Sequence, residues 1–125
     1  MSHVLLVALG GGLGASARYL TNLAALRVLG PNFPWGTITV NILGSFLMGV
    51  LIATLARMSG TSAELRSFVA TGFLGGFTTF SAFSLDFASM WERGDQGAGM
   101  VYLLASVVIS ILALFAGLYL VRSIA

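Results

Sequence analysis

The sequence has few of the residues on which most enzymes and disulfide-bonded proteins depend. It contains no cysteine, which excludes a disulfide framework and a thiolate metal site. It has a single histidine, His3, and four acidic residues, which form no carboxylate pair, no His-containing triad and no metal-ligand cluster. We therefore expect no enzymatic activity.

Charge is scarce as well. Charged residues make up 8% of the chain, against about 25% in an ordinary soluble domain. All the basic residues are arginines, and they are scattered singly, so no nucleic-acid partner is expected. Hydrophobic residues make up 58% of the sequence. A soluble fold of this length could not bury so much apolar surface, so we expect much of it to face a lipid bilayer.

Four apolar stretches are long enough to cross the hydrocarbon core, which requires about 20 residues. They run over residues 4–26, 36–56, 65–91 and 99–121. Both prolines lie in the loop before Trp35, a residue typical of the membrane interface. A polar segment that includes Ser59 and Thr61 follows the second stretch. The sequence thus predicts one all-α membrane domain, residues 1–125, with four transmembrane helices.

The arginines give little indication of orientation. An even number of spans places both termini on one side, together with Arg57, Arg66 and Arg122, while Arg27 and Arg93 lie on the other. Orientation follows the bias of basic residues in short loops, and three against two is almost no bias. Antiparallel pairing of molecules inserted both ways and a single orientation both remain open.

Small residues four apart in each span permit close helix approach, within one subunit or between subunits. These pairs are Gly10 and Gly14, Ser45 and Gly49, Gly72 and Gly76, and Ala113 and Gly117.

Two stripes of neutral polar residues lie inside the spans. Residues four apart share a helix face. The stripes are Thr37, Asn41 and Ser45 in the second span, and Tyr102, Ser106 and Ser110 in the fourth. Such groups donate hydrogen bonds without charge, so they can line a polar pathway or join helices to one another.

The third span predicts a helix broken near its middle. It is interrupted by Gly72, Gly75 and Gly76, followed by Thr78 and Thr79. Non-helical backbone at membrane depth persists where it is buried in protein or lines a wet cavity, and its free carbonyls can coordinate a cation. The alternative is a glycine packing face on an unbroken helix.

Phe80 and Phe83 follow this segment, three residues apart, so they can share a face. Aromatic rings have a positive edge that can meet a small anion; the alternative is that both rings pack or face lipid. Arg18 is the only basic residue that lies more than two residues from the end of a span. It can concentrate anions in a vestibule, or it can cap carbonyls of a neighbouring helix.

Three segments resemble the Fluc fluoride channel family, also called CrcB. They are GGLGASARY at residues 11–19, GTITVNILGSF at 36–46 and GFLGGFTTFS at 72–81. The resemblance covers essentially the whole chain. It implies an antiparallel, dual-topology homodimer in the bacterial plasma (inner) membrane, with two fluoride pores and a central structural sodium ion. It also implies passive fluoride export that confers fluoride resistance.

The resemblance further implies the roles of individual residues. The sodium would be held by the backbone carbonyls of Gly75 and Thr78. Fluoride would meet Asn41, Phe80, Phe83, Ser81 and the polar track of Tyr102, Ser106 and Ser110. Family members typically have threonine where this chain has Ala82, which removes one hydroxyl.

Two other functions compete with this one. A small multidrug transporter also has four spans and little charge bias, but it uses a carboxylate within the membrane. The first span has none, and Asp86 lies near a loop. A non-conducting assembly subunit is the other alternative, and it would leave the polar stripes without a purpose.

Overall fold

The computed structural model describes residues 2–58, 60 and 62–124, and within these residues the secondary structure is entirely helical. Ser59 and Thr61, expected in the loop after the second span, lie outside the described residues. The elements are α1 (His3–Leu29), α2 (Trp35–Arg57), α3 (Ala63–Arg66), the π-helix η1 (Ser67–Leu74), α4 (Gly75–Phe77), α5 (Ser81–Glu92) and α6 (Gln96–Ser123).

Four segments are long and apolar enough to cross a membrane, judged by length and composition. They are α1, α2, the run from α3 to α5, and α6. A helix of 27 residues, such as α1, is roughly 40 Å long, which exceeds the hydrocarbon core. The chain is a multi-pass membrane protein, as the sequence predicts.

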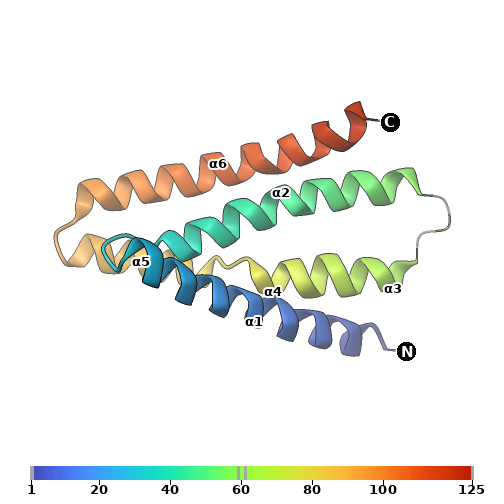
Figure 1. Ribbon diagram of the computed structural model, residues 1–125, viewed down its shortest axis with the longest axis horizontal. Coiled ribbons are helices and arrows are strands. Elements are labelled where there is room, and N and C mark those ends of the chain that lie inside the picture. The colour runs from blue at the N-terminus through green and yellow to red at the C-terminus, as the bar shows by residue number, and fades with distance from the viewer. Residues whose placement is uncertain (1, 59, 61, 125) are drawn as a thin grey trace.

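The helices run side by side, and both termini lie at the same end of the bundle (Figure 1). The α2–α3 connection is also at that end, while the α1–α2 and α5–α6 loops are at the other. The helix α2 packs along α6, and α1 packs along η1 and α4. We call the two ends the terminal end and the loop end.

Polar caps define where several helices begin and end. The Ser2 hydroxyl accepts a hydrogen bond from the Val4 amide at 3.2 Å, and Ser62 accepts one from Leu65 at 3.0 Å. Such caps satisfy amides that have no partner within the helix. Gly30 ends α1 with a φ of 83°, and its amide donates to the Leu26 carbonyl.

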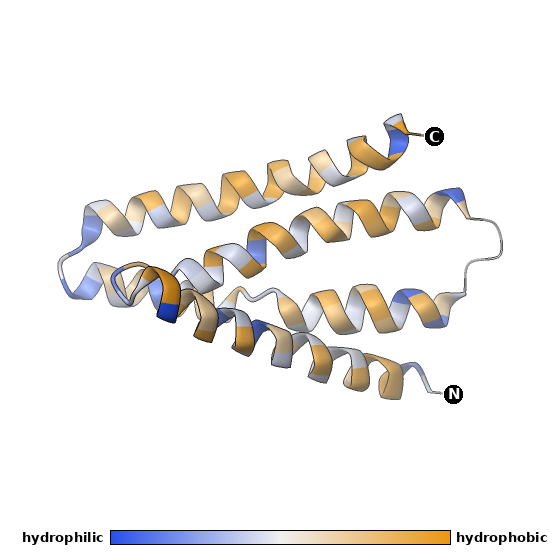
Figure 2. Ribbon diagram, in the orientation of Figure 1, coloured by the Kyte–Doolittle hydropathy of each residue, from blue (hydrophilic) through white to orange (hydrophobic). Residues whose placement is uncertain are grey.

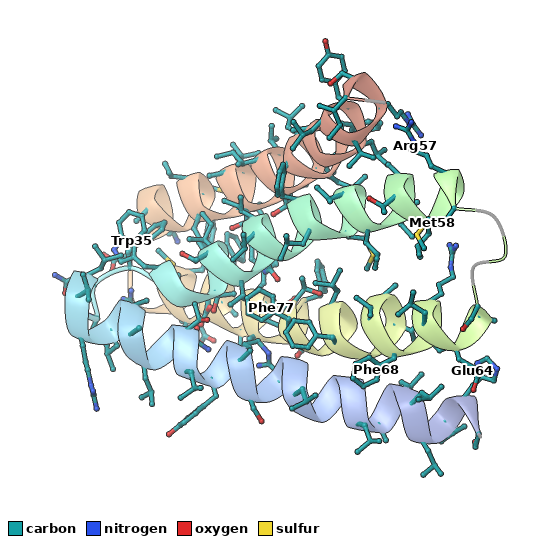
Figure 3. All side chains as sticks on the ribbon, turned by 45° about the vertical axis from the view of Figure 1, so that its right-hand side comes forward. Trp35, Arg57, Met58, Glu64, Phe68 and Phe77 are labelled. Atoms are coloured by element: carbon teal, nitrogen blue, oxygen red, sulfur yellow. The ribbon has the colours of Figure 1, made fainter. Side chains whose placement is uncertain are left out.

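Most residues along α2 and α6 are hydrophobic, whereas hydrophilic residues gather at the helix ends and loops (Figure 2). Trp35 lies at the loop end, whereas Arg57 and Glu64 lie at the terminal end (Figure 3). Arg57 donates to the Val121 carbonyl at 2.9 Å, which joins the end of α2 to the end of α6. This distribution is that of helices whose middles meet lipid and whose ends meet water.

Glycines let helices within one subunit approach closely. A Cβ on Gly10 or Gly14 would overlap the backbone of Phe68 or Phe73 on η1. Between α2 and α6 the same relation is mutual, because a Cβ on Gly49 would overlap the backbone of Leu114 and one on Gly117 would overlap that of Phe46. These small residues therefore pack helices inside the subunit.

The third span is broken, but not at its glycines. Gly72, Gly75 and Gly76 are all helical. A Cβ on Gly76 would overlap the backbone of Gly11, so this glycine serves the contact with α1. The helical path ends at Thr78, which is extended with φ −85° and ψ 159°, and a short non-helical stretch precedes α5 (Figure 1). The third span is thus broken near its middle, as predicted, but the glycines do not interrupt it, because the break comes after them at Thr78.

Candidate functional site

Asn41 holds the break in the third span. Its side-chain amide donates to the Thr79 carbonyl at 2.9 Å, and its side-chain oxygen accepts from the Thr79 amide at 2.7 Å. A helix break frees backbone groups that would cost free energy if left unpaired in an apolar interior. One residue of α2 thus satisfies both backbone groups of Thr79. One N–H of the Asn41 amide is used in this pairing, and the amide has two.

Side chains also cap the two helix ends that meet at the break. The Thr79 hydroxyl accepts a hydrogen bond from the Ala82 amide at 3.1 Å, which caps the start of α5. On the other side, the Arg18 Nε donates to the Gly76 carbonyl at 3.1 Å. Of the two roles considered for Arg18, the structure supports the carbonyl cap. A cation at a helix C-terminus also meets the negative end of the helix dipole.

The carbonyl oxygens of Gly75 and Thr78 lie at this break. The Thr79 amide, which would bond Gly75 in a continuous helix, is directed to Asn41 instead. Within residues 2–58, 60 and 62–124, no hydrogen bond that we observe ends on either carbonyl. The described residues also contain no group of three or more His, Cys, Asp or Glu side chains that could hold a metal. Backbone oxygens at an unwound segment are suited to a sodium ion. The carbonyls of Gly75 and Thr78 therefore fit the sodium ion that the resemblance implies.

Phe80, Phe83 and Tyr102 form a row of rings. The centroids of Phe80 and Phe83 are 5.6 Å apart, and those of Phe83 and Tyr102 are 5.2 Å apart. Phe83 is 5% exposed, whereas Phe80 is 76% exposed. The Ser81 hydroxyl lies 3.4 Å from that of Thr79. One ring of the predicted pair is therefore packed within the subunit, and the other projects from it.

A groove of about 240 Å³ runs beside these rings. We call it the inner groove. It is lined by Asn41, Ser45, Thr78, Thr79, Phe80, Phe83, Ser106, Val107, Ser110 and Ile111. None of these side chains carries a charge. The groove thus brings together five of the residues predicted for an ion pathway, which come from α2, the break, α5 and α6.

Two hydroxyls of the inner groove lack a partner. The side-chain oxygens of Ser106 and Ser110 are buried and form no hydrogen bond with the described residues. Leaving a buried polar group unpaired is costly, and native proteins contain few such groups. These two hydroxyls are therefore enclosed, unpaired polar groups at the wall of the groove.

Tyr102 differs from the two serines of its stripe. It is fully buried, and its hydroxyl donates to Asp86 at 3.0 Å, so it reaches the inner groove only through its contact with Phe83. Sequence reasoning missed Asp86 because the residue lies near a loop. The sequence signal that could have identified Asp86 is its spacing from Phe83. The two residues are three apart, so they share a helix face.

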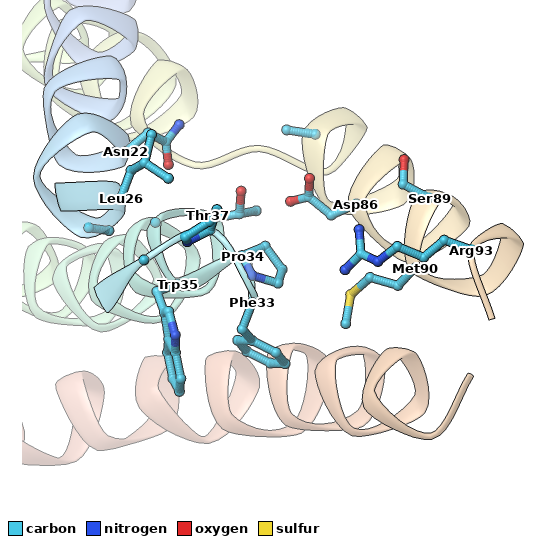
Figure 4. A pocket seen from close by; sticks show the side chains of 15 residues that line it. Asn22, Leu26, Phe33, Pro34, Trp35, Thr37, Asp86, Ser89, Met90 and Arg93 are labelled. Carbon is cyan, nitrogen blue, oxygen red and sulfur yellow. The ribbon is translucent and has the colours of Figure 1, made fainter. Parts of the chain in front are cut away.

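A second cavity, of about 380 Å³, opens at the loop end. We call it the outer cavity. Its walls come from the end of α1, the α1–α2 loop, the start of α2 and α5, and Figure 4 shows Asn22, Thr37, Asp86 and Arg93 around it. Thr37 lines the outer cavity, whereas Asn41 and Ser45 of the same stripe line the inner groove. The polar stripe of α2 therefore lines both the outer cavity and the inner groove.

Comparison with known proteins identifies the family of this chain. Residues 5–118 match the family described as "CrcB-like protein, Camphor Resistance (CrcB)". The chain is 60% identical over 124 residues to a fluoride-specific ion channel FluC of Mesorhizobium japonicum, covering 99% of both chains. It is similar to proteins of the same name from Chelativorans sp., at 60% identity, and Agrobacterium fabrum, at 54%, each again covering 99% of both chains. The chain belongs to the CrcB-like, or Fluc, family.

Proposed function

We propose that this protein is a fluoride-selective ion channel and that the inner groove is part of its pore. The observation that carries the proposal is the lining of the groove, which combines unpartnered buried hydroxyls, an amide and aromatic rings without a charged side chain. The relatives at 54% to 60% identity are named as fluoride-specific channels, which are transport proteins and not enzymes.

The lining suits the chemistry of fluoride. Fluoride is small and strongly hydrated, so a pore must replace its water with hydrogen-bond donors. Ser106 and Ser110 have hydroxyls available, and Asn41 keeps an N–H that does not bond Thr79. Ring edges carry partial positive charge, so Phe80 and Phe83 attract an anion weakly. Conduction requires sites that bind and also release, which neutral donors allow better than arginines would.

The working unit in this proposal is an antiparallel homodimer with two pores. Arginines are almost evenly divided between the two ends, which allows insertion in both orientations. Phe80 is largely exposed in a lone subunit although it borders the inner groove. A partner subunit would cover this ring and close the groove, and Ser81 beside it would then contribute its hydroxyl to the pore.

A structural sodium ion at the break completes the proposed assembly. The carbonyls of Gly75 and Thr78 would hold it, and the partner would supply the same two oxygens. When bound, the ion supplies a positive potential near the pores and a link between subunits. The residues of this chain would prepare the site, because Arg18 holds the backbone between Gly75 and Thr78 and Asn41 holds it directly after Thr78.

The biological role we propose is passive export of fluoride across the bacterial inner membrane. Flow would follow the fluoride gradient and the membrane potential, and it would protect the cell from fluoride.

Fluoride efflux from liposomes tests the proposal. Purified protein is reconstituted, a potassium ionophore sets the voltage, and a fluoride electrode records release, with chloride measured in parallel. We expect rapid, ionophore-dependent fluoride release and little chloride release. Absence of fluoride release from folded dimers would contradict the channel and favour a non-conducting assembly subunit.

A further inference from the structure

The outer cavity lies on the loop-end side of the inner groove. On α2, Thr37 of the cavity lies one helical turn from Asn41 of the groove. On α5, Asp86 of the cavity lies three residues from Phe83 of the groove. Between the two spaces, Asp86 accepts a hydrogen bond from the buried Tyr102 hydroxyl, and the Tyr102 ring contacts Phe83. On the proposed pathway, an ion in the inner groove would pass this pair to reach the outer cavity at the loop end.

Two charged side chains line the outer cavity, Asp86 and Arg93, among the residues that the structure describes. They have opposite signs. Arg93 follows α5, and Figure 4 shows its side chain extended along the cavity wall past Met90. Asp86 repels an anion in this space, and Arg93 attracts it.

Arg93 is only partly engaged by a partner. Its Nε donates to Asp95 at 2.8 Å, and the two side chains are 50% and 53% exposed. A guanidinium has five N–H donors in a fixed fork, so most of them remain for another acceptor. Ion pairs at such exposure are weak, because water screens them. An anion that enters the cavity can therefore compete with Asp95 for the guanidinium.

We propose that Arg93 is an anion-collecting residue at the mouth of the pathway and that Asp95 limits its effect. This inference rests on the proposed channel function. A charge in a recess with low-dielectric walls raises the local concentration of counter-ions. Arg93 offsets the repulsion by Asp86, and it does so in water, where an anion is held loosely and continues into the groove.

The test compares Arg93→Gln with Arg27→Gln. Both variants remove one positive charge at the loop end, but Arg27, in the last turn of α1, does not line the cavity. Initial fluoride efflux is measured at low fluoride, with gluconate salts setting the ionic strength near 10 mM or near 1 M. Circular dichroism and gel filtration establish that each variant is folded and assembled like the wild type.

At low ionic strength we expect Arg93→Gln to lower efflux by about threefold, the Boltzmann factor for one unit charge several ångströms away in water. Arg27→Gln should stay near the wild-type rate. Arg93→Lys should keep most of the wild-type efflux, and Asp95→Asn should raise it. At high ionic strength all variants should converge, because the screening length falls from about 30 Å to about 3 Å.

Other results overturn the inference. Equal efflux from Arg93→Gln and Arg27→Gln at low ionic strength would remove any special role for Arg93. A loss that persists unchanged at high ionic strength, or that Arg93→Lys does not repair, would mean that Arg93 supports the fold and does not collect anions. A wild-type protein without fluoride efflux would contradict the channel itself. That failure is distinct from normal wild-type efflux that a substitution at Arg93 leaves unchanged, which would contradict only the role of Arg93.

Discussion

The inner groove and the outer cavity present different chemistry to an ion on one proposed path. The groove has only neutral lining groups, whereas the cavity at the loop end has Asp86 and Arg93. Burying an isolated charge costs far more free energy than burying a hydroxyl. Full charges are therefore expected only where water reaches them. On the proposed path, the groove would therefore select the ion, and the cavity would adjust the local concentration of the ion.

The largest expected effect contrasts the same substitution in the two spaces. Asn41→Asp places a carboxylate in the groove, where it repels fluoride and loses the donor to the Thr79 carbonyl. We expect fluoride efflux to fall by about a hundredfold or more, because charges interact strongly where water is scarce. Asn22→Asp, in the outer cavity, should lower efflux only a few-fold. Equal effects of the two would remove the distinction between groove and cavity.

The rings of the groove come next. Phe80→Ile or Phe83→Ile removes an aromatic edge but keeps an apolar side chain of moderate size. We expect about tenfold lower fluoride efflux while the dimer persists on gel filtration, since a ring edge contributes roughly a kcal/mol to such contacts. Phe115→Ile, on an exposed ring of α6, is the control and should conduct normally. Undiminished efflux in both groove variants would remove these rings from the pathway.

Removing an unpartnered hydroxyl should have a smaller effect on efflux and should not lower the stability of the protein. Ser106→Ala or Ser110→Ala deletes a donor to the ion, so we expect efflux to fall by roughly threefold to tenfold, as for one ordinary hydrogen bond. Thermal stability should not fall, because neither hydroxyl bonds the described part of the protein and the buried polar cost disappears. A clear drop in melting temperature would mean that these serines join helices and do not serve the ion.

The smallest expected effect is in the outer cavity. Asp86→Asn removes the negative charge and keeps an oxygen that can accept from the Tyr102 hydroxyl. We expect about threefold higher efflux at low ionic strength and little change at high ionic strength, because the cavity is wet and screened. A strong loss of efflux at both ionic strengths would instead place Asp86 among the groups that handle the ion directly.

The sequence predicts the four helices and much of the groove for simple reasons. Spans of this length and apolarity have few alternatives, and a spacing of four residues places Ser106 and Ser110 on one face of α6. Periodicity could not show what Asn41 and Tyr102 bond, because those partners, Thr79 and Asp86, belong to the third span.

The break illustrates the same limit. Glycine weakens a helix by its freedom, which favours a break at Gly72, Gly75 or Gly76. In the folded chain Gly76 instead permits contact with α1 and remains helical. The break comes at Thr78 and Thr79, where Asn41, Arg18 and the Thr79 hydroxyl satisfy the backbone. Asn41 and Arg18 come from other helices, so only the tertiary structure supplies these two partners.

Electrical recording of the purified protein in planar bilayers tests the central claim most directly. With fluoride as the permeant anion on both sides, we predict discrete current steps whose reversal potential follows the fluoride gradient, and no steps when chloride replaces fluoride. Silent bilayers containing verified, folded protein, or chloride steps as large as those in fluoride, would contradict a fluoride-selective channel.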